Sequence, residues 1–120
     1  MARQPAIGEM TFRAEFQRRG VVDDGVGNEV PGGAWETMFV RSARLTPLKG
    51  GEEFIAARLE GRQAYSLVVY DSPTTRQVTE AWQVVDFKAR DRVFAISAPG
   101  IDPVGNRRFR EWLIVEGAPS

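Results

Sequence analysis

The stretch from Leu45 to Ala57 reads LTPLKGGEEFIAA and decides the fold that this sequence predicts. A strand-like run ends at Pro47, because proline has no amide hydrogen to donate to a sheet ladder. The backbone then passes through Gly50 and Gly51, which tolerate conformations that other residues avoid. We interpret this stretch as the place where a chain patterned for strands is interrupted.

The residues that follow are the best helix candidate in the sequence. Residues 52–60 begin with two glutamates, and Arg58 lies near their end, which suits the helix dipole at both termini. Ile55 and Leu59 are four residues apart, so they share one face. Because a helix this short is marginal on its own, we expect that face to pack on a sheet.

The chain before this stretch is patterned as strands. From Met10 to Gln17 apolar and polar residues alternate, which is the period of a half-buried strand. Glycines and short polar residues between Asp23 and Asn28 predict a hairpin-like turn, and we expect the residues from Pro31 to Gly33 to extend that loop. A second strand is expected from about Trp35 to Leu45.

Four more strands are expected after it, separated by polar loops. They span about residues 63–70, 82–87, 92–97 and 107–115. Short strands with turn signals between them are typical of an antiparallel barrel or sandwich, and a barrel leaves no exposed sheet edge. The sequence therefore predicts a mainly β fold: a small antiparallel β-barrel of about six strands, with one short α-helix and long loops.

The length of 120 residues is that of one domain. Residues 1–9 are polar and have no periodicity, so we expect a flexible N-terminal arm. Residues 10–120 are expected to form the single barrel domain. No apolar run reaches the roughly 20 residues of a membrane span, and no apolar segment follows the N-terminal charge as in a signal peptide. We expect a soluble protein without membrane contact.

Composition limits the chemistry that the chain can perform. It contains neither cysteine nor histidine, which removes the usual nucleophile–histidine pairs and the usual zinc ligands. Two adjacent acidic pairs remain, at residues 23–24 and 52–53; the first belongs to a turn and the second to a helix end. We therefore expect no enzyme activity, no cofactor and no catalytic or metal-binding residue.

The charged residues point toward protein contacts. Sixteen basic and sixteen acidic side chains cancel, which argues against a general nucleic-acid binder. Apart from Lys49 and Lys88 every basic residue is an arginine, a side chain favoured at protein interfaces. A coding bias toward arginine would explain the same excess.

The last expected strand is apolar on both faces. Phe109, Leu113 and Val115 share one face, and Trp112 and Ile114 share the other. Such a strand is either covered on both sides by its own chain or covers a partner.

An arginine cluster accompanies that strand. Arg107, Arg108 and Arg110 with Phe109 and Trp112 are the best candidate for stacking and neutralising a single-stranded nucleic acid. The alternative is that Phe109 belongs to the core and that the arginines are solvated or pair with acids of another subunit. We favour this alternative.

The order of these landmarks resembles that of the head–tail joining proteins of long-tailed bacteriophages, which are also called head-closure or stopper proteins. The resemblance extends from about Phe12 to Val115. Its landmarks are, in order, the Asp-Gly-bearing turn at 23–28, Trp35, the Pro47-Leu48-x-Gly-Gly-Glu52 stretch with Ala56-Ala57, the Tyr65–Val69 strand, the Trp82–Val85 and Val93–Ile96 hairpin strands, and the arginine-rich strand from Arg107 to Leu113.

This resemblance implies a structural protein without catalysis. It implies a homo-oligomeric ring, six- or twelve-fold, with a portal or adaptor ring above and tail terminator or tail tube proteins below. The ring would close the channel of the head, contact packaged double-stranded DNA without sequence specificity, and dock the tail. The setting would be a virion or a phage-like particle, from a phage, a prophage or a gene transfer agent, assembled in the cytoplasm of the bacterial host.

The resemblance also implies a loop directed into the channel. Two segments are candidates, the region from Lys49 to Glu53 and the loop from Asp71 to Glu80. The family often places an arginine directly after the central strand, where this chain has Tyr70-Asp71 and reaches its next arginine at Arg76. The candidate interface or channel residues are Lys49, Gly50, Gly51, Glu52, Glu53, Arg76, Arg107, Arg108, Arg110 and Trp112.

Two other functions remain open at this point. The chain could be another ring of the same connector, either the adaptor or the tail terminator, although the adaptor is expected to be mainly helical. It could also be a small β-barrel that binds single-stranded nucleic acid.

Overall fold

The computed structural model describes residues 10–48, 51, 61–98, 100–103, 105 and 107–117. These residues form six strands and one short 3₁₀ helix, which are β1 (Phe12–Asp23), β2 (Glu29–Pro47), β3 (Gln63–Tyr70), η2 (Thr75–Gln77), β4 (Gln83–Asp86), β5 (Ala89–Ile96) and β6 (Phe109–Glu116). The expected N-terminal arm, the expected helix at 52–60 and the candidate residues Lys49, Gly50, Glu52 and Glu53 lie outside the described residues.

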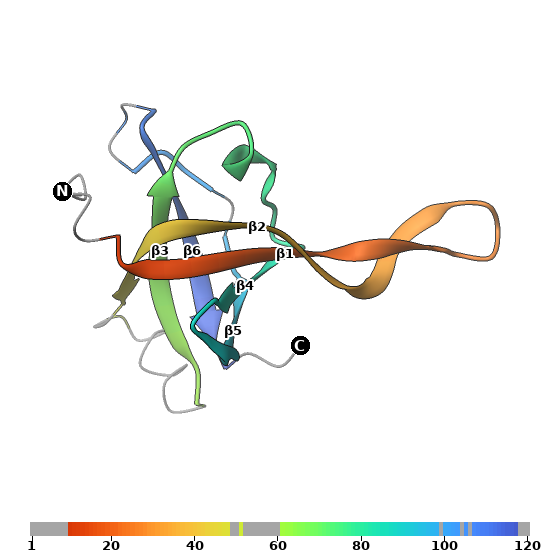
Figure 1. Ribbon diagram of the computed structural model, residues 1–120, viewed down its shortest axis with the longest axis horizontal. Coiled ribbons are helices and arrows are strands. Elements are labelled where there is room, and N and C mark those ends of the chain that lie inside the picture. The colour runs from red at the N-terminus through yellow and green to blue at the C-terminus, as the bar shows by residue number, and fades with distance from the viewer. Residues whose placement is uncertain are drawn as a thin grey trace.

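The six strands form one antiparallel sheet that closes on itself. Their order is β1-β2-β3-β6-β5-β4, a closed barrel, and β1 completes it by pairing residues 14–17 with β4. Figure 1 shows the strands wrapped around a common interior. The prediction of a mainly β fold built from a six-stranded antiparallel barrel is confirmed.

Side chains fill the barrel interior. The inward-facing core consists of Ala14, Phe16, Ala43, Leu67, Val69, Val78, Trp82, Val84, Phe94, Ile96, Trp112 and Ile114. Within it the Phe16 ring stacks on Phe39 with centroids 4.9 Å apart and lies 5.3 Å from the Trp112 ring. A six-stranded barrel has room only for such side chains, so a channel wide enough for DNA could form only between copies of the chain.

A second apolar cluster lies on the outside of the barrel. Met10, Val68 and Phe109 form it, and the Tyr70 ring stacks on Phe109 at 5.1 Å. Trp112 and Ile114 belong to the inner core instead. The expectation that β6 is apolar on both faces is therefore confirmed, and Phe109 is covered by its own chain.

The strands β1 and β2 continue far beyond the barrel as a two-stranded hairpin (Figure 1). Their pairing runs from Phe12–Ala43 to Asp23–Glu29. In contrast, β4 pairs with β1 only at residues 14–17, and β3 pairs with β2 only at residues 44–47. We call residues 18–36 the hairpin arm.

The arm corrects one expectation from the sequence. The residues from Pro31 to Gly33 were expected in a loop, but they belong to β2. Gly33 lies against the backbone of Gly20, and a Cβ added to Gly33 would lie 3.0 Å from the Gly20 carbonyl oxygen. The glycines thus allow two strand backbones to approach at the register shift between Arg19 and Val21. The turn expected between Asp23 and Asn28 closes the arm.

Candidate functional site

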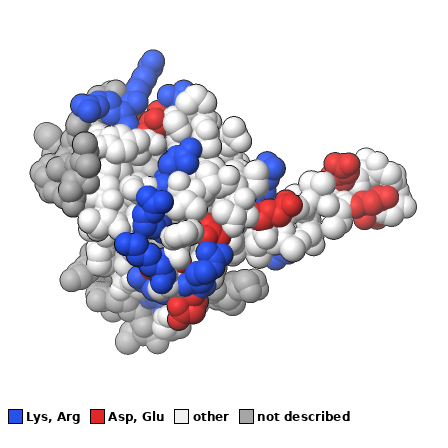
Figure 2. Space-filling view, in the orientation of Figure 1, with Lys and Arg blue, Asp and Glu red and all other residues white. Residues whose placement is uncertain are grey.

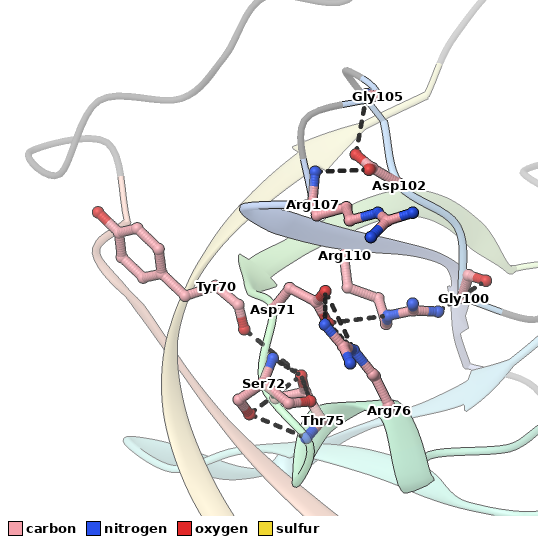
Figure 3. Close-up of polar contacts among 10 residues, drawn as sticks. All are labelled: Tyr70, Asp71, Ser72, Thr75, Arg76, Gly100, Asp102, Gly105, Arg107 and Arg110. Atoms are coloured by element: carbon pink, nitrogen blue, oxygen red, sulfur yellow. Dashed lines mark hydrogen bonds and ion pairs between the residues drawn. The ribbon is translucent and has the colours of Figure 1, made fainter.

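Two loops from distant parts of the sequence meet at one end of the barrel (Figure 3). One follows β3 and the other precedes β6, and the amide of Asp71 joins them by donating to the carbonyl of Arg108 at 2.9 Å. The first loop is also bonded internally. Its Ser72 and Thr75 exchange two backbone-to-hydroxyl hydrogen bonds of 2.9 and 3.1 Å, with Thr75 fully buried.

The carboxylate of Asp71 is the centre of this site. Arg76 donates to it through Nε and Nη2, at 3.0 and 2.8 Å, and Arg110 donates through Nε at 3.3 Å. The Asp71 side chain is 4% exposed, whereas that of Arg76 is 53% exposed. The Arg76 hydrogen bonds hold the pKa of Asp71 below its usual value, and Arg110 adds to this effect. Asp71 is therefore an ionised anchor for two arginines.

The second loop is shaped by another carboxylate. Asp102 accepts hydrogen bonds from the amides of Gly105 and Arg107, at 2.9 and 2.7 Å. Arg107 has a positive φ of 60°, a conformation uncommon for residues other than glycine. These bonds fix the point from which the Arg107 side chain leaves the backbone.

Together the loops line a recess of about 370 Å³, formed by Asp71, Arg76, Asp102, Arg107 and Arg110. Its three guanidinium groups outnumber its two carboxylates. Arginine presents several donors in a plane that matches carboxylate and phosphate groups. The recess is therefore suited to an anionic group of a partner, and we call it the arginine recess.

The described residues contain no group of three or more acidic side chains arranged to hold a metal ion. Nor does any helix within them have the length and apolar character required to cross a membrane.

The structure brings together part of the predicted site. Arg76, Arg107 and Arg110 share the recess although they come from separate loops, and Arg108 is exposed beside it. Trp112 is different: only 1% of it is exposed, and it belongs to the core. With Phe109 also buried, neither ring offers the surface that stacking a base would need.

In the region from Lys49 to Glu53, the first candidate for the channel loop, the structure describes Gly51, which is partly buried.

A second surface, the end of the hairpin arm, was not predicted. Val26 is 79% exposed and Val21 60% exposed, and Val22 and Val30 also face solvent. The sequence identified the turn at the end of the arm. It gave no sign that the turn projects beyond the barrel, because strand periodicity is the same in a barrel and in a free hairpin.

A buried ion pair was also missed. Glu15 is 2% exposed and accepts two hydrogen bonds from Arg90, at 2.5 and 2.9 Å, together with bonds from Thr37 and Gln17. The Arg90 bonds are the main reason why the pKa of Glu15 falls to about 2. The sequence pattern predicted that the strand containing this region begins at about residue 92, but β5 begins at Ala89 and includes Arg90, and the turn before it lies at 87–88.

Comparison with known proteins gives one family. The family model described as phage head completion protein matches residues 5–117. No curated protein matches the chain.

Proposed function

The chain belongs to the phage head completion protein family, and on this basis we propose that it forms a ring between the portal or adaptor and the tail. The ring would close the DNA channel of the filled head and provide the surface on which the tail docks. The observation that carries this proposal is the family match, which extends over residues 5–117 and thus nearly the whole chain.

The architecture supports a function that requires several copies of the chain. The barrel interior is filled with side chains, so a channel has to be formed by several copies. The two most distinctive surfaces, the arginine recess and the end of the hairpin arm, differ in charge and shape. Different surfaces on one chain suit head-to-tail contacts, and such contacts produce closed rings when the rotation closes.

The family implies a virion component that interacts with other head and tail proteins. We propose the portal or adaptor ring as the upper partner and the tail terminator or tail tube as the lower partner, with packaged DNA in the channel contacted without sequence specificity. Assembly would take place in the cytoplasm of the bacterial host. Residues 10–120 would act as a single domain.

We assign different roles to the two candidate loops. The loop after β3 is held by the Asp71 ion pairs and the Ser72–Thr75 bonds, which supports a role as a fixed docking surface. The arginine recess beside it would receive an anionic group of a neighbouring head or tail protein. The region from Lys49 to Glu53 then remains the candidate for the loop directed into the channel.

A deletion in a strain that produces the particle would test this proposal. Without the gene, we expect DNA-filled heads that carry no tails and lose their DNA, and supplying the wild-type gene in trans should restore joined particles. Normal numbers of tailed, infectious particles in the deletion strain would contradict the proposal.

The recess can be tested in the same strain. Arg107→Glu reverses a charge in the recess, and we expect tail joining to fall about tenfold or more, as for a charge pair at an interface. Lys88→Glu is the matched control, because Lys88 is exposed in the turn between β4 and β5. Equal effects of the two variants on tail joining would show that the recess is not part of the docking surface.

A further inference from the structure

The end of the hairpin arm combines acidic and apolar groups. Between residues 20 and 34 there are three acids, Asp23, Asp24 and Glu29, and no lysine or arginine. Because the whole chain is neutral, the remainder carries the balancing excess of basic residues. Figure 2 shows this separation, with acidic side chains at the far end of the arm and most basic side chains on the barrel.

The acids at this end are arranged unfavourably for an isolated molecule. Asp23 lies directly opposite Glu29 in the strand register, and like charges in such a pair destabilise a sheet. The Oδ1 atom of Asp24 is occupied, since it accepts hydrogen bonds from the amides of Val26 and Asn28 at 2.9 and 3.2 Å. Within the described residues no ion pair neutralises any of the three acids.

The arm also lacks strand partners in the barrel. Each of its strands pairs only with the other, and an isolated two-stranded hairpin is at best marginally stable in water. The valines at its end remain exposed. A basic surface with apolar patches would relieve the charge repulsion and cover these valines.

Such a surface exists at the other end of the same hairpin. A groove of about 430 Å³ is lined by Met10, Arg13, Val40, Arg41, Ser42 and Tyr70. Arg13 donates to the Ser42 hydroxyl at 3.2 Å, and the Arg41 guanidinium lies 4.8 Å from the centre of the Phe39 ring. Neither arginine has a carboxylate partner within the described part of the chain. We call this the Arg13 groove.

A chain cannot place its own arm in its own groove. Arg13 pairs with Ser42 in the barrel, whereas Asp23 pairs with Glu29 ten residues further along β1. At the rise of an extended strand, ten residues correspond to about 33 Å. The two surfaces therefore lie at opposite ends of one hairpin, and they can meet only between two molecules.

We propose that the end of the hairpin arm of one copy docks in the Arg13 groove of the next copy. Asp23 and Glu29 approach Arg13 and Arg41, while the valines cover Val40 and Tyr70. The contact joins two different surfaces, so it repeats from copy to copy and generates a ring when it closes. This inference rests on the proposed ring assembly and names the contact that builds it.

Packaged DNA is a less suitable partner for the end of the arm than the groove of a second copy. Three carboxylates at its end repel phosphates, whereas nucleic-acid contacts depend on lysine and arginine. The arm matches the chain's own groove in both charge and apolar character.

A disulfide ladder tests the contact directly, since the wild-type chain contains no cysteine. Full-length protein carrying both Val26→Cys and Ser42→Cys is concentrated and then oxidised. A disulfide needs Cα atoms within about 7 Å, so the pair can form only between copies. We expect covalent trimers and larger species from the double variant, whereas each single-cysteine variant should stay monomeric, because the proposed contact joins position 26 only to position 42. Monomers and dimers alone from the double variant would overturn the proposal.

A charge exchange provides a second test that does not depend on oxidation. Glu29→Lys and Arg13→Glu should each weaken self-assembly about tenfold or more, as measured by sedimentation. A mixture of the two variants should assemble to within about threefold of wild type, because alternating copies restore every contact. Asp91→Lys, at an exposed acidic position of β5 outside the arm, is the matched control. Failure of the mixture to recover, or an equal loss in the control, would refute the contact.

These outcomes can be separated from failure of the proposed function. If the ladder is absent but deletion of the gene still yields tailless heads, the arm contact is wrong and the connector role stands. If the ladder forms but the deletion has no effect on particles, the chain self-assembles through the arm without serving as the connector.

Discussion

Glu15 is an acid on the outer side of β1 that is nevertheless buried, because Arg90 of β5 covers it with two hydrogen bonds. Its pKa of about 2 lies below the ordinary value of 4.5. A carboxyl whose folded pKa is depressed contributes stability above its unfolded pKa and loses it as pH falls through the folded value. The Glu15 contribution is therefore complete above about pH 4.5 and lost toward about pH 2.

Glu15→Gln should consequently lower the free energy of unfolding by about 2–3 kcal/mol at pH 7. The difference from wild type should shrink between pH 4.5 and 2, because the wild-type carboxyl becomes protonated there. Urea unfolding at a series of pH values measures this. A difference that stays constant over that range would show that charge at Glu15 is not responsible.

Asp71 holds Arg76 and Arg110 in place at the arginine recess. Removing it in Asp71→Ala leaves two arginines without their shared carboxylate and should cost about 1–2 kcal/mol of stability. Asp91→Ala, at an exposed position of β5, is the control and should change stability by less than about 0.5 kcal/mol. Equal stabilities of the two variants in denaturant unfolding would contradict an anchoring role for Asp71.

At the scale of elements, the hairpin arm is separable from the barrel. Arg19 and Trp35 are register partners, so residues 20–34 can be replaced by a two-residue Asn-Gly turn that fits an antiparallel pair. We expect the shortened chain to keep the six strands of its barrel and to unfold within about 1 kcal/mol of wild type, because the removed residues lie outside the core.

Self-assembly of the shortened chain should be lost, as followed by sedimentation at the same concentrations as wild type. The base of the arm is retained in it, including the Arg18 guanidinium 5.7 Å from the centre of the Trp82 ring. Unfolding of the barrel on shortening would mean that the arm is part of the folding unit. Unchanged assembly would exclude it from the subunit contact.

Some elements follow from local sequence and others do not. The bounds of β3 and the turn at 23–28 could be predicted, because period-2 alternation and glycine–aspartate turns are local signals. The strand through Pro31 could not, since it depends on Gly33 meeting Gly20 across the hairpin. The Glu15–Arg90 pair joins residues 75 positions apart, which no local pattern reveals.

The candidate site was predictable to a similar extent. Arginines at 107, 108 and 110 were visible as a cluster, but the convergence of Arg76 with Arg110 on Asp71 depends on two loops meeting in space. Trp112 was predicted to be an interface residue because β6 is apolar on both faces. The sequence of a single strand does not reveal which of its faces points into the barrel. Closure of the sheet decides that question.

The whole molecule is a filled barrel with an acidic arm at one end and basic surfaces elsewhere. Its barrel has no room for DNA, and its distinctive surfaces are suited to contacts between proteins. The arrangement is consistent with a family of head completion proteins, and it gives the proposed ring a specific subunit contact.

We propose above all that this chain forms a ring between the portal or adaptor and the tail. Electron microscopy of full-length protein mixed with portal–adaptor complexes tests it most directly. We predict an additional ring beneath the adaptor, with each hairpin arm extending to the neighbouring copy and the channel closed. Complexes that remain unchanged in the presence of excess protein would contradict the account.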